Sequence, residues 1–276
     1  MAELVGGFCI PHVPLVAAQF ESAPQDKQKI VMDGYATVTR RLRELEVDTV
    51  VMIGDDHYTI FGTDIVPRCL IGIGEVEGPV EEWLGIPRRR IPNNTELAEH
   101  IMRDGFAHEV DWAVSKTLAM DHSVTVPWHF TIAPAPEIRT VPIYLCAAVE
   151  PLISSARARR IGAITGNAIR SFPGRSRVAV IGTGGISHWV GMARMGDVNE
   201  TFDRRILDLV SRGDVDAMVA LQDEAVIDAA GNGALEIKNW IFAMAALGVN
   251  TRAELIAYSA IPQWVCGFGF VELKAA

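Results

Sequence analysis

Apolar residues form strand-like runs that alternate with helical stripes along most of the chain. The runs typical of strands lie at residues 4–10, 49–53, 65–71, 141–147, 178–181, 255–258 and 268–273. Helical periodicity lies between them, at residues 27–45, 152–169, 202–210 and 235–247. The pattern therefore predicts an α/β fold, in which a sheet is flanked by helices on both faces.

The order of these segments refines the prediction. The late strands follow one another closely, which favours antiparallel pairs, so we expect a mixed β-sheet. No internal repeat and no linker rich in Pro, Gly or Ser divides the chain, which predicts a single domain over residues 1–276. Residues 74–94 contain three prolines and are expected to form an irregular surface loop that borders a site.

Composition excludes several classes of partner. The net charge is −9 and no basic face can be recognised, which argues against nucleic acid, because binding it requires neutralising phosphates. No apolar run is long enough to span a bilayer, and no secretion signal precedes His12. The four cysteines lack any CxxC spacing and are expected to be reduced and buried. These features predict a soluble, cytoplasmic protein.

Three histidines follow expected strands directly. His12 follows the first strand, His57 follows the second, and His188 follows the strand at 178–181. Ligand sites in open α/β sheets lie beyond the carboxyl ends of the strands, so these side chains are expected to converge on one crevice. His122 lies between helical and strand patterns. A lone histidine at a strand end is more often structural than a ligand, so metal binding and a structural role both stay open.

An acidic partner for these histidines is less obvious from the sequence. Asp55 and Asp56 flank His57 and are candidates to ligate or orient it. Glu236 lies near the start of a strongly apolar helix, where an unpaired buried carboxylate would be costly. It then needs a cation, either Lys238 or a metal. The alternative is a largely solvated first-turn glutamate favoured by the helix dipole.

Residues 182–185 form a glycine-rich segment, Gly-Thr-Gly-Gly, directly after a strand. A phosphate-binding loop is one interpretation, but the segment lacks the lysine of a P-loop and the spacing of GxGxxG. The simpler interpretation is a tight turn that lets His188 approach a ligand closely.

Five motifs occur in the order found in a known family. They are His12-Val13-Pro14, Asp55-Asp56-His57, the segment from Asp121 to Pro127, the segment from Gly182 to His188, and Glu236 with Trp240. Each motif is common, but five in this order are specific. The sequence resembles the class III, LigB-type extradiol ring-cleavage dioxygenases, especially the catalytic β subunit of protocatechuate 4,5-dioxygenase, over most of the chain.

The resemblance implies a set of roles for these residues. It implies Fe(II) held by His12, His57 and Glu236, a two-histidine, one-carboxylate face that leaves positions open for substrate and O2. It implies that His188 is the acid/base residue and that His122 is a second catalytic histidine in the pocket. Residues assigned to the substrate are Pro14, Asp121 and Trp264. The implied partners are an aromatic diol and O2, a homo-oligomer, and in some members a small helical subunit.

One departure from the family bears on the substrate. Protocatechuate enzymes carry a serine soon after the late Ile-Pro, whereas here Ile261-Pro262 is followed by Gln263 and Trp264. An indole suits a stacking wall better than a carboxylate clamp, so we expect a catecholic or hydroxypyridone-type ring without a carboxylate. The alternative is that Trp264 fills core space and another residue supplies the clamp.

Other functions stay open at this point. A protocatechuate- or gallate-type 4,5-dioxygenase subunit is the nearest alternative. A zinc hydrolase would use the same ligands, although the HExxH spacing is absent. A nucleotide-binding protein would use residues 182–185. A non-enzymatic relative would be expected to have lost ligands or His188, and all of these are present.

Overall fold

The structure is a computed structural model that describes residues 1–248 and 251–275. It contains a nine-stranded mixed sheet in the order β4-β3-β6-β2-β7-β1-β9-β8, with β5 pairing β3 in addition. The strands are β1 (Glu3–Ile10), β2 (Thr49–Asp55), β3 (Cys69–Gly78), β4 (Arg89–Ile91), β5 (Ala113–Ala119), β6 (Arg139–Leu145), β7 (Arg177–Thr183), β8 (Arg252–Ile261) and β9 (Cys266–Lys274).

Parallel pairing is confined to the centre of the sheet and to the β3–β5 pair. Strands β6, β2, β7 and β1 run parallel, whereas β9 pairs antiparallel with β1 and with β8. Strand β3 is antiparallel to β6 and to β4. The predicted α/β class and mixed sheet are therefore confirmed.

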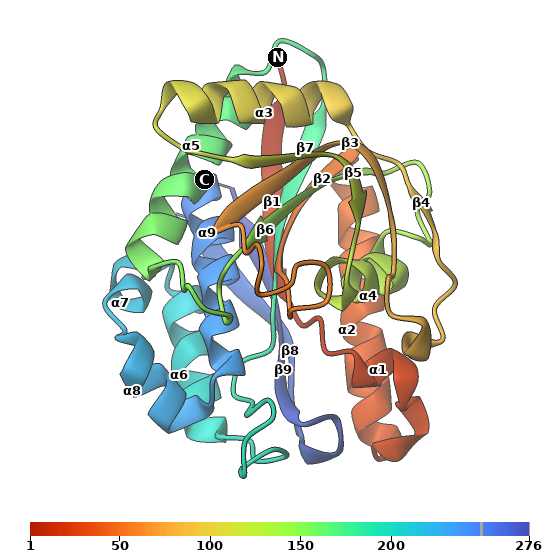
Figure 1. Cartoon of the computed structure of the whole chain (residues 1–276). Coiled ribbons are helices and arrows are strands. Elements are labelled where there is room, and N and C mark those ends of the chain that lie inside the picture. The colour runs from red at the N-terminus through yellow and green to blue at the C-terminus, as the bar shows by residue number, and fades with distance from the viewer. Residues whose placement is uncertain (249–250, 276) are drawn as a thin grey trace.

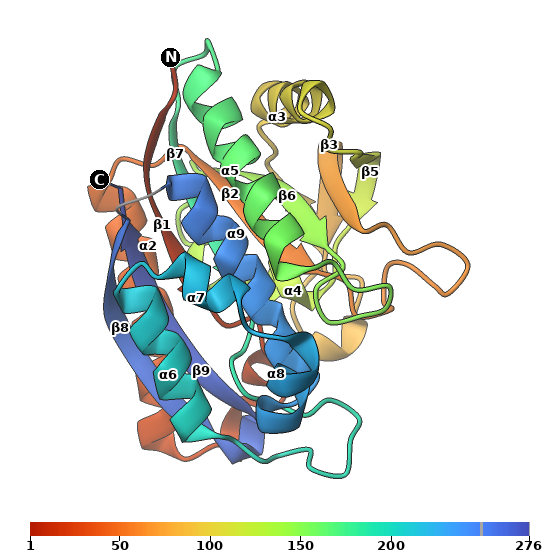
Figure 2. The same ribbon diagram turned by 90° about the vertical axis from the view of Figure 1, so that its left-hand side faces the viewer.

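Helices cover both faces of the sheet (Figure 1, Figure 2). On one face lie α3, α5, α6 and α9, with α7 and α8 beside them; on the other lie α2 and α4, with α1 next to α2. Their bounds are α1 (Leu15–Ala18), α2 (Gln25–Glu44), α3 (Thr95–Ala107), α4 (His122–Thr131), α5 (Ser155–Ser171), α6 (Glu200–Ser211), α7 (Val215–Val219), α8 (Asp223–Ala230) and α9 (Ile237–Leu247). Short 3-10 turns are η1 (Phe20–Ser22), η2 (Glu82–Leu84), η3 (Gly233–Glu236) and η4 (Pro262–Trp264).

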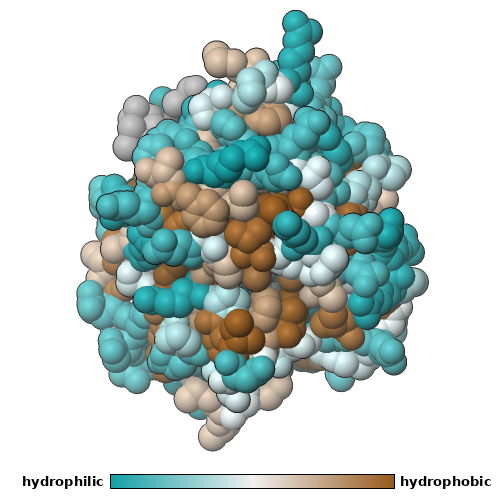
Figure 3. All heavy atoms as spheres, turned by 45° about the horizontal axis from the view of Figure 1, so that its top comes forward, coloured by the Kyte–Doolittle hydropathy of each residue, from teal (hydrophilic) through white to brown (hydrophobic). Residues whose placement is uncertain are grey.

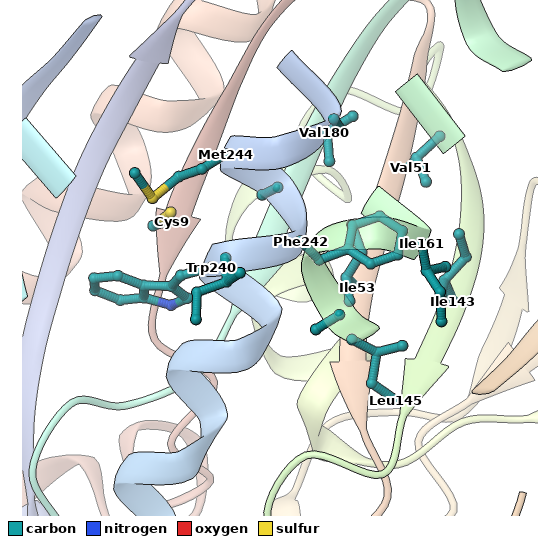
Figure 4. Packing of buried hydrophobic residues seen from close by; sticks show 14 of the residues in the cluster. Cys9, Val51, Ile53, Ile143, Leu145, Ile161, Val180, Trp240, Phe242 and Met244 are labelled. Atoms are coloured by element: carbon teal, nitrogen blue, oxygen red, sulfur yellow. The ribbon is translucent and has the colours of Figure 1, made fainter. Parts of the chain in front are cut away.

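Strand β2 explains why both layers are needed. All seven of its residues are buried. Val51 and Ile53 face the core under α5 and α9, whereas Val50 and Met52 face the core under α2 and α4. Because successive side chains of a strand point to opposite faces, a strand that is apolar throughout requires cover on both. Figure 4 shows α9 packing against this side of the sheet, with Phe242 beside Ile161 and Ile53.

Several elements differ from the sequence-based expectation. The strand expected at 65–71 begins at Cys69; Ile65 is exposed, and Pro67 lacks the N–H that a strand pair requires. Residues 74–94 are more regular than predicted, because they complete β3 and contain η2 and β4. Strand β5 and helices α4, α7 and α8 were not predicted. They are short, and their burial depends on neighbours that are remote in sequence.

Two further predictions concern membrane spans and the thiols. No helix among the described residues is long and apolar enough to cross a membrane. All four cysteines are free thiols and buried. On the face drawn in Figure 3, apolar side chains gather near the middle and are surrounded by mostly hydrophilic ones.

Candidate metal centre and active site

The site lies where three adjacent parallel strands end. Strands β2, β7 and β1 are neighbours in the sheet, and their carboxyl ends meet at the same edge. His12 lies two residues beyond β1, and His57 lies two residues beyond β2. The last residue of β7 is Thr183. His12 and His57 therefore lie at the same edge of the sheet, as the sequence predicted.

Glu236 lies at the centre of this cluster. It ends η3, directly before α9, and is only 1% exposed, which excludes the solvated alternative. Its Oε2 lies 3.1 Å from Nε2 of His12, and its Oε1 lies 3.4 Å from Nε2 of His57. The backbone N–H of Gly185 donates to Oε2 at 2.7 Å. Gly184 has φ +153°, and a Cβ there would lie 2.7 Å from Cβ of Glu236.

Hydrogen bonds fix the tautomer of both ligand candidates. Thr183 Oγ1 has one proton and two carbonyl acceptors, those of Ile53 and Ser123, so it accepts from Nδ1 of His12 at 3.0 Å. The carboxylate of Asp121 accepts from Nδ1 of His57 at 2.9 Å. Both imidazoles consequently present Nε2 toward Glu236, and this is the nitrogen that binds a metal ion once it has no proton. This orientation is how metal-binding histidines are held by a second partner.

The cluster fits a metal ion. Nε2 of His12 is buried and has no hydrogen-bond partner among the described residues. A ring nitrogen and a buried carboxylate that face each other need a shared cation between them, either a proton or a metal ion. Lys238, the alternative cation, is directed elsewhere, because its Nζ lies 2.8 Å from Oδ2 of Asp223. Ligand atoms of four residues lie within 4.8 Å of one another: His12, Asp55, His57 and Glu236.

The two aspartates beside His57 differ in role. Oδ1 of Asp55 accepts from Asn239 at 2.8 Å, whereas its Oδ2 is buried without a partner and lies 3.7 Å from Nε2 of His57. Burial and the nearby Glu236 raise the pKa of Asp55 to about 6. The carboxylate of Asp56 instead accepts three backbone N–H groups of residues 59–61 and shapes the loop.

The two remaining histidines border this cluster. Nε2 of His188 lies 3.2 Å from Oε1 of Glu236, and its Nδ1 lies 3.2 Å from the carbonyl oxygen of Ile186. Burial lowers the pKa of His188, but Glu236 and Cys266 together outweigh it and raise the pKa well above its ordinary value. The ring of His122 lies 4.2 Å from the ring of His57, centroid to centroid. His122 is the first residue of α4, and Asp121 is the N-cap, accepting from the N–H of Ser123.

A cavity of about 250 Å³ opens onto these groups. Its polar lining consists of His12, His57, His122, His188 and Glu236. The rest of its lining is apolar and comprises Val13, Pro14, Leu15, Trp83, Val190, Met195 and Val265. A small apolar cavity with a few convergent polar groups is the usual form of a small-molecule site.

Two residues assigned to the substrate from the sequence lie outside the cavity wall. Trp264 is fully buried, packs beside Phe20 and Phe268, and donates from Nε1 to the carbonyl oxygen of Gln19. The stacking wall expected from its position is thus not found, and the core-filling alternative describes it. Asp121 is also fully buried and holds His57. Of the three residues assigned to the substrate, only Pro14 lines the cavity.

Trp83 and Glu81 are among the residues of the site that sequence reasoning missed. Trp83 lies in η2 and lines the cavity while 58% exposed. Glu81 is buried, and its Oε1 lies 2.6 Å from Nδ1 of His122. Both lie in the stretch expected to border a site, but its irregular pattern gave no reason to select them.

The glycine-rich turn after β7 has no free amides for a phosphate. The N–H of Gly184 donates to the carbonyl oxygen of Ile10, and that of Gly185 donates to Glu236. A Cβ on Gly185 would lie 3.0 Å from Cε1 of His188 and even closer to Cys266. The turn therefore serves close packing around the site, as the simpler interpretation proposed.

The fold and the site define an α/β protein with a buried cluster of histidine and carboxylate groups able to hold a metal ion. The family described as the catalytic LigB subunit of aromatic ring-opening dioxygenase matches residues 6–269. The chain belongs to this family and is an extradiol ring-cleavage dioxygenase. This membership gives no support to the hydrolase and nucleotide-binding alternatives.

Similar curated proteins cover nearly the whole chain. A protein of Burkholderia vietnamiensis named 2,3-dihydroxyphenylpropionate/2,3-dihydroxicinnamic acid 1,2-dioxygenase is 26% identical to this chain, and the match covers 96% of this chain and 96% of the relative. A protein of the same name from Klebsiella pneumoniae is also 26% identical, and the match covers 95% of this chain and 96% of the relative. The crystal structure of an uncharacterized protein from Escherichia coli K12 has a TM-score of 0.61 at 9% identity, over 97% of this chain and 99% of that one. That likeness concerns the fold alone.

Proposed function

We propose that this protein is an Fe(II)-dependent extradiol dioxygenase that cleaves a dihydroxyphenyl or hydroxypyridone-type ring without a carboxylate. The observation that carries the proposal is the pair of Nε2 atoms, from His12 and His57, directed at the buried carboxylate of Glu236 at the floor of an apolar cavity. Two histidines and one carboxylate with open positions are the ligand set typical of non-haem Fe(II) oxygenases.

His12, His57 and Glu236 would hold the iron. When bound, the ion supplies coordination of the diol and of O2 on one face, and electron transfer between them. Asp55 lies near the same cluster, with its partnerless Oδ2 3.7 Å from His57 Nε2. Since Oδ1 of Asp55 is held by Asn239, we assign Asp55 to the tuning of charge and not to the three-residue ligand set.

His188 and His122 are the proposed proton carriers. A diol loses protons as it binds, and imidazole is suited to accept one near neutral pH. His188 lines the cavity and lies within hydrogen-bond distance of Glu236, which places its ring beside the ligand cluster. His122 lines the cavity next to His57. The apolar walls contributed by Val13, Val190 and others exclude water and so protect reactive intermediates.

The cavity lining supports a substrate without a carboxylate. Within the described part of the chain, no lysine, arginine, serine or threonine lines the cavity. Arg194 precedes the lining residue Met195, but its guanidinium stacks on Trp189 at 4.1 Å and pairs with Asp197 at 2.9 Å. A carboxylate on the ring would be desolvated without a charged partner, which is costly. The names of the relatives indicate a dihydroxyphenyl ring with an acidic side chain, so the side chain is where we expect this protein to differ.

Metal and oxygen measurements test the metal-dependent part of the proposal. Protein purified without oxygen should contain about one iron per chain. His12→Ala, His57→Ala and Glu236→Ala should each reduce iron occupancy and catechol-dependent oxygen uptake to background. His100→Ala, a half-buried control outside the site that bonds Ser171, should leave both unchanged. Full iron occupancy in a ligand variant would remove that residue from the ligand set.

A matched pair of substrates tests the substrate class. A 3-alkyl catechol and 2,3-dihydroxyphenylpropionate differ mainly in the charge at the end of the side chain. We expect kcat/KM to be at least about tenfold higher for the alkyl catechol, since an unpaired buried charge costs more than 1.4 kcal/mol. Protocatechuate should be poorer as well. A higher kcat/KM for the propionate would overturn the substrate class and leave the ring-cleavage activity intact.

Assembly and location are proposed on the family resemblance alone. We propose that the protein forms a homo-oligomer in the cytoplasm. We further propose that a small helical partner subunit binds to it, as in some members of the family. Light scattering of the purified chain should give a mass above 30.1 kDa. A monomer with full oxygen uptake would contradict the oligomer, and activity of the chain alone would exclude a required partner.

A further inference from the structure

Glu81 and His122 form a buried pair at one side of the cavity. Oε1 of Glu81 lies 2.6 Å from Nδ1 of His122 and also accepts the backbone N–H of His122 at 3.2 Å. The side chains are 5% and 10% exposed, respectively. A carboxylate that bonds both the ring and the backbone of one residue constrains the ring more tightly than a single contact does.

The pair determines which nitrogen of His122 faces the site. A carboxylate accepts hydrogen bonds, so Nδ1 of His122 carries the proton that is donated to Glu81. His122 lines the cavity, and Nε2 is its only ring nitrogen left for a ligand. The contact with the ring of His57 does not fix this orientation, because two tilted rings with centroids 4.2 Å apart permit either flip of the imidazole.

The segment that carries Glu81 is anchored independently of His122. The N–H of Val80 donates to the carbonyl oxygen of Met120 at 3.0 Å, and the N–H of Met120 donates to that of Glu77 at 2.8 Å. These bonds tie the end of β3 to the residues just before α4. Glu81 is therefore held by backbone on a rigid neighbour, which is what orienting a catalytic side chain requires.

His188 provides the contrast within the same site. Its Nδ1 faces the neutral carbonyl oxygen of Ile186 at 3.2 Å, and its Nε2 faces Glu236. The ring of His188 is thus oriented by its own turn and by the ligand cluster, whereas His122 depends on a carboxylate that lies outside that cluster. Glu81 has no ligand role in the proposed iron site, so its loss affects His122 and not the metal.

We propose that Glu81 is a positioning residue, which fixes the ring and the tautomer of His122 so that Nε2 faces the substrate. This inference rests on the proposed function. Oε2 of Glu81 is buried without a partner among the described residues, so the two contacts of Oε1 with His122 hold the side chain there. Trp83, two residues further on, lines the cavity, and the same anchored segment therefore places a wall residue beside the oriented histidine.

Three variants of the iron-loaded protein test the role. Glu81→Leu removes the acceptor, and we expect kcat to fall about 10- to 100-fold while KM changes less than about threefold and iron content is unchanged. Glu81→Gln keeps an oxygen that accepts from Nδ1, so it should recover kcat to within about tenfold of the unmodified protein. Glu82→Gln alters the exposed neighbour and should behave like the unmodified protein.

A measurement without turnover completes the test. In the metal-free protein labelled with ¹⁵N-histidine, with His122→Ala used for assignment, Nδ1 of His122 should appear protonated and Nε2 unprotonated. Glu81→Leu should shift this balance. An unchanged kcat in Glu81→Leu, a Gln variant no better than Leu, a loss of iron, or a protonated Nε2 in the unmodified protein would each overturn the proposal. Absence of all ring cleavage in the unmodified protein would instead refute the proposed function, while the ¹⁵N result still decides the Glu81 pair.

Discussion

Thr183 Oγ1 lies 3.0 Å from Nδ1 of His12, although the two residues are 171 positions apart in the sequence. The hydroxyl proton is committed to a backbone carbonyl, so the imidazole is the donor. The last residue of one strand thereby fixes the tautomer of a histidine that follows the neighbouring strand. The residues that hydrogen-bond to the metal ligands are therefore as necessary to the site as the ligands themselves.

This relationship predicts the effect of removing the hydroxyl. Thr183→Val keeps the shape of the strand and removes the acceptor for His12, so iron affinity should fall about 10- to 100-fold, measured by competition with a chelator. Thr140→Val is a matched control, because Thr140 is also buried in a strand and its Oγ1 has no hydrogen-bond partner in the described part of the chain. Equal affinities for the two variants would show that Thr183 does not orient His12.

Gly233 predicts a way to displace His188 without altering it. A Cβ at this position would lie 2.1 Å from Nε2 of His188, so Gly233→Ala must move the ring. We expect the variant to retain iron and to lose most of its oxygen uptake, as His188→Ala should. If Gly233→Ala lost iron but His188→Ala did not, the role of the glycine would instead be to shape η3 and so position Glu236.

Asp55 predicts a dependence of stability on pH. Burial and Glu236 raise its pKa to about 6 in the folded, metal-free protein, so ionising it opposes folding. The penalty is absent below the ordinary aspartate pKa of about 4, grows as the pH rises through 6, and is complete above it, where it amounts to about 3 kcal/mol. Asp55→Asn should therefore stabilise the metal-free protein at pH 8 and have little effect near pH 4.

Denaturant unfolding of the two metal-free proteins at several pH values measures this difference. Asn239 can still donate to an asparagine at position 55, so the hydrogen bond is preserved in the variant. Addition of a divalent cation should reverse the order, because a cation favours the ionised carboxylate. A stability difference that does not change with pH would contradict the raised pKa.

The same substitution is predicted to have different effects at Trp264 and at Trp83: it should lower stability at the first and change KM at the second. Trp264 is fully buried, so Trp264→Ser should lower the free energy of unfolding by about 3–5 kcal/mol without improving the cleavage of carboxylate-bearing rings. Trp83 is 58% exposed at the cavity, so Trp83→Ser should change KM with less than about 1 kcal/mol of destabilisation. Improved protocatechuate cleavage by Trp264→Ser would restore the pocket role expected from the sequence.

Local patterns were sufficient to predict the main layers and the edge of the sheet that carries the site. Apolar runs and helical stripes report burial directly, so β1, β2, β7, α2 and α5 could be located from the sequence. Because carboxyl ends of parallel strands share one edge, His12 and His57 could be expected to meet there. The short β5 and α4 could not, because their burial comes from neighbours far away in the chain.

The sequence by itself determined the α/β class and drew attention to His12, His57, His188 and Glu236 through their places beside strands and an apolar helix. Only the tertiary structure decided the partners of those groups. It pairs Lys238 with Asp223, so that Glu236 faces the histidines instead. It also moved Trp264 into the core and brought Glu81 to His122. The physical reason is that periodicity records which side of an element is buried, whereas a hydrogen-bond partner depends on how separate elements pack.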